Sequence, residues 1–346
     1  MNTYDPADLR KKKKKKVKKE KTQSSGLVGL VVFLSIVAVI LGYCVVVSID
    51  PNISLPTGKP KEEETPVTYV GVLEVHGTMS SDGDELSSEY NQKWLLEQID
   101  TMMHDPNNKG LILSIDTPGG SVYTVDELYL KIKEYQTTTM RPVYSYMESM
   151  AASGGYYISA PADKIYANRN CWTGSIGVTI GTVYDITELL ENLGIKTVTI
   201  TAGSNKAMGS ATEKLTDEQK AIYQSLVDEA YNQFVDIVAE GRKMDRNAVV
   251  KLADGRIYTA KQAFTNGLID AIGTREEAIA AMKTDYAMFD CTTKYYTYEQ
   301  EFSLSNFLFG LSKELGKDAK SEYNEIMELS ENYGTFSISY MAHERN

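Results

Sequence analysis

The chain has 346 residues, of which 42% are hydrophobic, and its formal net charge is −11. Residues 1–25 hold ten basic and three acidic side chains and carry +7, so the other 321 residues carry −18. A strongly acidic body argues against nucleic acid as a partner. The three cysteines, at positions 44, 171 and 291, form neither a disulfide framework nor a metal-ligand spacing, so we expect no metal and no cofactor.

An apolar segment follows the basic tail. Residues 26–49 are 24 residues without a charge, and about 20 apolar residues span a bilayer. A cleavable signal peptide is the alternative, but its apolar region is usually shorter, and no clean cleavage site follows here. We therefore expect one uncleaved transmembrane helix in the cell membrane. The lysine run before it predicts a cytoplasmic N-terminus and an extracytoplasmic domain.

The remaining chain divides by composition. Residues 50–66 contain four prolines and several charges, which is typical of an extended linker. From residue 67 to residue 290 short apolar runs alternate with amphipathic segments, and this range is the predicted catalytic domain. Residues 291–346 are predicted to be a C-terminal extension, because most of them are more polar and lack a clear period.

Periodicity predicts the elements of the domain. Strands are expected at Tyr69–Val75, Gly110–Ile115, Pro142–Met147, Lys164–Ala167 and Thr197–Thr201. Helices are expected at Trp94–His104, at Val122–Tyr135 and after a capping box formed by Thr216 and Gln219. In this last helix the inward positions are predicted to be Ile222, Leu226, Ala230, Phe234 and Ile237. Strands that alternate with helices indicate an α/β fold with parallel βαβ units.

Ser153 is the candidate nucleophile. It lies among alanine and glycine in the segment 149–159, just after a predicted strand, so a substrate backbone can approach closely. A second glycine-rich corner, Pro118–Gly120, follows another apolar run. Two such corners after two strands, one of them carrying a serine, favour acyl transfer with an oxyanion hole.

The base that would serve Ser153 is less clear from the residues alone. The three histidines, His76, His104 and His343, are in no catalytic signature and are interpreted as surface or packing residues. A buried lysine can replace histidine, because desolvation disfavours its charged form. Lys206 is the best candidate because small residues surround it in the chain. Pattern alone does not select it over Lys196 or Lys214.

Five motifs, in this order and approximate spacing, resemble the signal peptide peptidase A family in its short bacterial form with one catalytic domain. They are Asp116–Val122 (Asp-Thr-Pro-Gly-Gly-Ser-Val), Met150–Ile158 (Met-Ala-Ala-Ser-Gly-Gly-Tyr-Tyr-Ile), Thr173–Val178 (Thr-Gly-Ser-Ile-Gly-Val), Gly203–Lys206 (Gly-Ser-Asn-Lys) and Asp254–Tyr258 (Asp-Gly-Arg-Ile-Tyr). The resemblance implies a Clp protease/crotonase-like fold of repeated ββα units. It also implies a serine endopeptidase that degrades leftover signal peptides and other apolar peptides at the membrane.

The resemblance also implies a role for individual residues. Ser153 matches the nucleophile, Lys206 the general base and Ser175 a serine that hydrogen-bonds the lysine. The oxyanion hole would be formed by the N–H of Gly154 with that of Gly119 or Gly120. The family further implies a homo-oligomeric ring in which neighbouring subunits complete each active site.

Two other functions stay open at this point. A crotonase-type acyl-CoA enzyme would share the fold and the oxyanion hole, but it needs no nucleophilic serine. A catalytically inactive membrane scaffold is the second alternative. The Asp254-Gly-Arg segment is interpreted as a tight structural turn.

Overall fold

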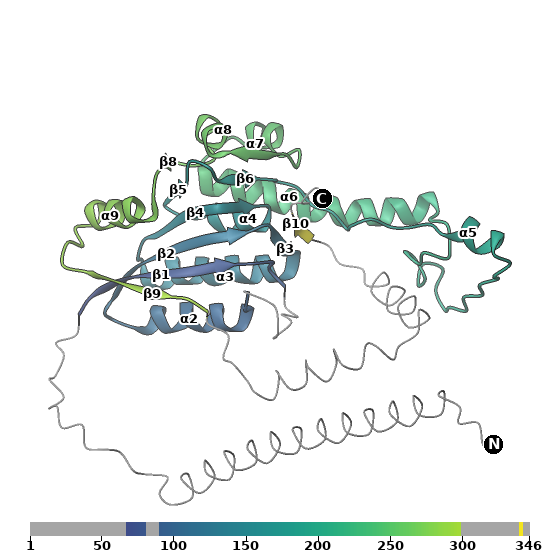
Figure 1. Ribbon diagram of the computed structural model, residues 1–346, viewed down its shortest axis with the longest axis horizontal. Helices are drawn as coiled ribbons and strands as arrows, with labels where there is room; N and C mark the ends of the chain where they lie inside the picture. Colours follow the sequence, from purple (N-terminus) through teal and green to yellow (C-terminus); the bar gives the residue numbers. More distant parts are fainter. Residues whose placement is uncertain (1–66, 81–89, 299–338, 342–346) are drawn as a thin grey trace, which may run out of the picture. The chain divides into compact units, whose positions relative to one another are not determined.

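The computed structural model describes residues 67–80, 90–298 and 339–341. Its centre is a sheet of eight strands in the order β7-β6-β4-β2-β1-β9, with β5 pairing β4 and β8 (Figure 1). The strands are β1 (Tyr69–His76), β2 (Asn108–Thr117), β4 (Val143–Ala152), β5 (Lys164–Ala167), β6 (Trp172–Gly174), β7 (Ile257–Thr259), β8 (Ala271–Ile272) and β9 (Thr292–Tyr296). All pairs are parallel except β6 with β7. The mixed α/β fold expected from the sequence is confirmed.

Helices cover both faces of the central strands. The helices α2 (Gln92–His104) and α3 (Val122–Thr139) pack against the side chains on one face of the sheet. The helix α9 (Arg275–Asp285) packs against the side chains on the opposite face. Because both faces are covered, β1 and β2 are buried along almost their whole length, as parallel strands usually are. Each helix begins at a side-chain cap, Asn91 for α2 and Ser121 for α3.

The second half of the domain is mainly helical and contains α6 (Asp217–Arg242), α7 (Arg246–Leu252) and α8 (Ala260–Thr265). The predicted capping box at Thr216 and Gln219 is present. The prediction of the inward positions of α6 was only partly right, since Ala230 and Phe234 are buried but Leu226 is exposed. The reason is that α6 packs on the core mainly through its C-terminal half, where Val235 and Val238 add to the contact.

The segment between β6 and α6 differs from the prediction. The expected strand at Thr197–Thr201 is absent, and all side chains from residue 191 to residue 204 are exposed. A strand needs a neighbour to take up its backbone hydrogen bonds, and these residues lie against no other strand of the described chain. We call residues 179–215 the arm. It contains the short helix α5 (Thr187–Asn192), and Figure 1 shows α5 beyond the N-terminal end of α6, away from the sheet.

The sheet continues past the predicted end of the domain at Asp290. Strand β9 pairs with β1 in parallel, and β10 (Ser339–Met341) pairs antiparallel with β3 (Gly119–Ser121). Both strands belong to the segment that the sequence placed in an extension. Cys171 and Cys291 are buried free thiols.

Several predictions concern residues outside the described ranges. They are the basic tail 1–25, the transmembrane segment 26–49, the linker 50–66 and His343. Among the helices that the structure describes, none is both long and apolar enough to span a membrane.

Candidate active site

Ser153 occupies the turn between β4 and the helix α4 (Gly154–Ser159). Its backbone angles, φ 53° and ψ −112°, are unusual for a residue other than glycine, and its side chain is buried. Two hydrogen bonds hold this conformation. The Ser153 N–H donates to the carbonyl oxygen of Gly174 at 2.8 Å, and the Ser153 carbonyl accepts from Tyr157 N at 2.9 Å. Strained residues of this kind, stabilised by their surroundings, cluster at active sites.

The glycine corner predicted at Gly119 and Gly120 lies against the start of α4. A Cβ on Gly154 would lie 3.0 Å from the Cα of Gly119 and 3.3 Å from the backbone nitrogen of Gly120. A Cβ on Gly120 would lie 1.8 Å from the carbonyl oxygen of Met79. Only glycine therefore permits the contact between β3, residue 79 and the turn that carries Ser153.

The two glycine amides of the corner differ in their partners. Gly119 N donates to Thr117 Oγ1 at 3.1 Å, and Thr117 Oγ1 donates in turn to the carbonyl oxygen of Gly77 at 2.5 Å. The Gly119 amide is thus used inside the fold. Gly120 lies opposite Tyr340 in the β3–β10 pair, so both residues have a partner within the fold. Gly119 and Gly120 therefore both stay candidates as the partner of Gly154 in binding an oxyanion.

Ser175 lies next to Ser153 in the backbone network. It follows Gly174, the residue whose carbonyl accepts from Ser153 N, and its own N–H donates to the carbonyl of Arg256 at 2.8 Å. Ser175 is buried and has a φ of 49°. The Asp254–Tyr258 segment supports this corner through the turn at Gly255, in agreement with the structural role predicted for it.

Within one chain, no hydrogen bond or ion pair of the described residues joins Lys206 to the corner formed by Ser153 and Ser175. It lies in the arm, its side chain is exposed, and its backbone N–H donates to Gly203 at 3.2 Å. Within the described residues no hydrogen bond connects Lys206 with Ser153 or Ser175. Of the alternatives, Lys214 forms an ion pair with Glu188 at 3.1 Å, and this bond raises the pKa of Lys214.

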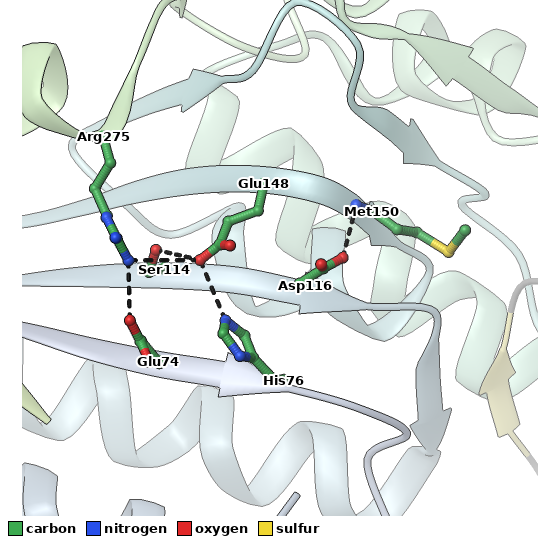
Figure 2. A network of polar contacts seen from close by, with 7 residues as sticks. All are labelled: Glu74, His76, Ser114, Asp116, Glu148, Met150 and Arg275. Carbon is green, nitrogen blue, oxygen red and sulfur yellow. Dashed lines mark hydrogen bonds and ion pairs between the residues drawn. The ribbon is translucent and has the colours of Figure 1, made fainter. Parts of the chain in front are cut away.

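A polar cluster on the sheet was not foreseen from the sequence (Figure 2). His76 Nε2 lies 3.2 Å from Glu148 Oε1, which also accepts from Ser114 Oγ at 2.6 Å. The hydrogen bond to Glu148 raises the pKa of His76, and the same bond lowers the pKa of Glu148. Alternating polar residues at the ends of β1 and β2 were the available signal. His104, by contrast, is exposed, and among the described residues its hydrogen bond is to the Asp100 carbonyl of its own helix.

No group of side chains among the described residues is suited to hold a metal ion. The arrangement instead presents a strained, buried serine beside two glycine amides. Such an arrangement is able to perform acyl transfer if a base reaches the serine.

Comparison with known proteins agrees with this geometry. The model of Peptidase family S49 matches residues 136–288. A putative signal peptide peptidase SppA from Enterococcus faecium is 34% identical over 285 residues, which cover 74% of this chain and 82% of that protein. The chain belongs to the S49 (SppA) family of peptidases. The prediction of a protease of this family is thereby confirmed.

Other S49 relatives have different lengths. A putative protease of Methanocaldococcus jannaschii is 34% identical over 65% of this chain and 73% of its own length. Protease 4 of Haemophilus influenzae is 32% identical over 70% of this chain but only 40% of its own length. Among solved structures, a ClpP1 mutant from Listeria monocytogenes is similar to 60% of this chain and 94% of its own, at 14% identity and a TM-score of 0.40.

Proposed function

We propose that this S49 peptidase is a membrane-anchored serine endopeptidase with Ser153 as its nucleophile. The observation that carries the proposal is the strained Ser153 at the β4–α4 turn, next to the backbone of Gly120 and Gly154. A serine at a sharp strand-to-helix turn places its Oγ beside the backbone amides at the start of the helix, and these amides can bind an oxyanion.

Lys206 is the proposed base, and we assign it to a neighbouring copy of the chain. A lysine must be desolvated for its amine to be neutral and accept a proton. Lys206 is exposed in the described chain, and the proposal is that a second copy desolvates it. The arm supports this assignment, because Val198 and Ile200 expose 83% and 92% of their surface near Lys206 in the sequence. A ring in which each arm reaches the next subunit would bury these side chains.

The reaction then follows from these positions. The neutral Lys206 amine takes the proton of Ser153 Oγ as this oxygen attacks the carbonyl carbon of the scissile peptide. The N–H groups of Gly154 and of Gly119 or Gly120 bind the oxygen that becomes negative, and Ser175 orients the lysine. The C–N bond breaks and the leaving amine receives the proton from Lys206. Water, deprotonated by the same lysine, then hydrolyses the acyl-enzyme and restores Ser153.

The peptide is proposed to bind along β3. Strand β10 occupies this edge in antiparallel register, with Tyr340 opposite Gly120, so a peptide that binds here would take the place of β10 (Figure 1). Backbone pairing of this kind selects extended peptides and excludes folded proteins. The Clp protease/crotonase-like arrangement of ββα units belongs to the same proposal and is supported by the parallel order β4-β2-β1.

The proposed substrates are leftover signal peptides and other apolar peptides in the membrane. The uncharged segment 26–49 and the lysine run before it support an anchored protein with an extracytoplasmic domain. Protease added to intact protoplasts should remove the domain. Full protection of the domain would overturn the orientation and the substrate class with it.

Covalent labelling with a fluorophosphonate tests the nucleophile directly. The full-length protein should be labelled at Ser153, and the Ser153→Ala variant should not be labelled. Labelling at another serine, or none in the wild type, would overturn the proposed mechanism and favour an inactive scaffold.

A further inference from the structure

The β4 strand contains a bulge just before the nucleophile. The pairing of β2 with β4 runs from Leu111 with Val143 to Ile115 with Met147 and resumes at Thr117 with Ala151. One residue of β2, Asp116, therefore lies opposite the three residues Glu148–Met150 of β4. Bulges next to active sites redirect the strand and the side chains that follow. Ser153 follows Met150 by three residues.

Carboxylates hold both ends of this bulge, as Figure 2 shows. At its far end, Asp116 Oδ1 accepts from the backbone nitrogen of Met150 at 2.9 Å. At its near end, Glu148 accepts from Ser114 and contacts His76, 72 positions earlier in the chain, at 3.2 Å. The position of the bulge is thus tied to β1 as well as to β2.

His76 is also close to the oxyanion corner. The N–H of its neighbour Gly77 donates to the carbonyl oxygen of Asp116 at 3.0 Å. The Gly77 carbonyl oxygen accepts from Thr117 Oγ1, and this hydroxyl in turn accepts from the Gly119 N–H. The end of β1 therefore contacts the two segments that lead to the site, the bulge and β3. A shift of His76 relative to Glu148 would move these segments relative to each other.

The charges that face His76 favour its protonated form. Glu148 on β4, Glu74 on its own strand and Asp116 on β2 act in this direction, whereas burial of the ring acts against it. Arg275, at the start of α9, is the opposing charge beside these carboxylates. Arg275 is 2.9 Å from Glu74 and 3.9 Å from Glu148. Three carboxylates and one guanidinium leave an excess of negative charge, which a proton on His76 reduces.

We propose that His76 and Glu148 form a proton-dependent clamp on the β4 bulge, and that His76 is a positioning residue for Ser153. The clamp is closed when His76 is charged and loosens when His76 loses its proton. This inference rests on the proposed role of Ser153 as nucleophile, and it adds a source of pH dependence separate from the lysine base.

The sign of the pH effect follows from the direction of the pKa shift. The pKa of His76 is raised, so the ion pair persists above the usual titration range of histidine and is lost as the pH rises through the shifted value. The lysine base has the opposite effect on the pH dependence, because it must be neutral to accept a proton and so becomes more active as the pH rises. In the wild type the reactivity of Ser153 should therefore rise with pH as the lysine loses its proton, and it should also contain a component that falls with pH as His76 loses its proton.

The first experiment measures the rate of fluorophosphonate labelling of Ser153 against pH in the full-length protein. His76→Gln and Glu148→Gln should each lose the falling component. Each should also label about three- to tenfold more slowly at low pH, less than the ~100-fold that a 1 Å displacement of a reacting group can cost. His104→Gln is the matched control and should keep the wild-type profile, because His104 bonds only within α2. Thermal melting of each variant verifies that it is folded.

The second experiment is independent of activity. The chain has three histidines, so a histidine-labelled sample gives three titrating ring signals in NMR, and the signal missing in His76→Gln is that of His76. Its pKa should be raised in the wild type and fall in Glu148→Gln. An ordinary His76 titration, or labelling profiles identical to the wild type in both variants, would overturn the clamp. If the wild type is not labelled at Ser153, the proposed function fails and the positioning role of His76 fails with it. The NMR titration still decides, independently of labelling, whether His76 and Glu148 form a proton-dependent pair.

Discussion

The backbone N–H of Ser153 donates to the carbonyl of Gly174 at 2.8 Å, which joins the nucleophile turn to the residue that precedes Ser175. The hydrogen bond crosses from the end of β4 to the end of β6, two neighbouring parallel strands. The two serines that the family resemblance singled out are therefore part of one rigid corner. Their relative position does not depend on the arm that carries Lys206.

Ser153→Ala should abolish peptide cleavage by at least about a thousandfold, as loss of a nucleophile does in other serine hydrolases. The fold should be unchanged, since the backbone hydrogen bonds of residue 153 do not use the side chain. A fluorogenic peptide assay measures the loss, and a thermal melt within ~3 °C of the wild type serves as the control. Cleavage at the wild-type rate would exclude the mechanism.

Ser175→Ala should lower the turnover only in part, by about fivefold, because one hydrogen bond that orients the base is worth ~1 kcal/mol. The loss should appear in kcat rather than in KM, since Ser175 is proposed to touch the base and not the peptide. A complete loss of activity in a folded variant would assign Ser175 a more direct role.

Lys206→Ala and Lys206→Arg should both be inactive, because arginine does not give up a proton in proteins. Lys214→Ala is the matched control on the same arm, and it should retain activity since Lys214 is paired with Glu188. Lys196→Ala tests the other lysine of the arm. Retained cleavage in Lys206→Ala, with loss in either of the other two variants, would reassign the base.

Mixing the two inactive variants tests whether the dyad spans two copies. If Ser153 and Lys206 come from neighbouring chains, co-expression of Ser153→Ala with Lys206→Ala at equal levels should restore about a quarter of the wild-type activity, the statistical share of intact pairs in a ring. Sedimentation of the same sample should show an oligomer. Persistent inactivity of well-mixed oligomers would place the base in the same chain as the serine.

Gly120→Ala should destabilise the domain and abolish activity, because the added methyl group would lie 1.8 Å from the Met79 carbonyl oxygen and the backbone there would have to move. Gly181→Ala is a useful comparison. A Cβ on Gly181 would meet no atom of the described chain within 4 Å, and the φ of Gly181 is 82°, so the substitution there carries only backbone strain, about 1 kcal/mol. Thermal melts of both variants measure the difference, and equal melting temperatures would contradict the steric argument.

Local patterns predicted the regular elements well. Lys164–Ala167 coincides with β5, and the capping box at Thr216 was identified from two residues alone. These features depend on neighbours a few positions away, which a sequence displays directly. The expected strand at Thr197–Thr201 failed because a strand also depends on a distant pairing partner, and the described chain provides none.

The sequence by itself determined the α/β class, the family and the candidate nucleophile, because small residues around Ser153 and the order of the motifs are properties of the chain alone. Only the tertiary structure decided how the β4 bulge is held, which partners Gly119 and Gly120 have within the fold, and that Lys206 is exposed. His76 and Glu148 are 72 positions apart, and Ser121 pairs with residue 339. Contacts of this kind arise from strand order and register, which bring remote residues together in space without leaving a local pattern.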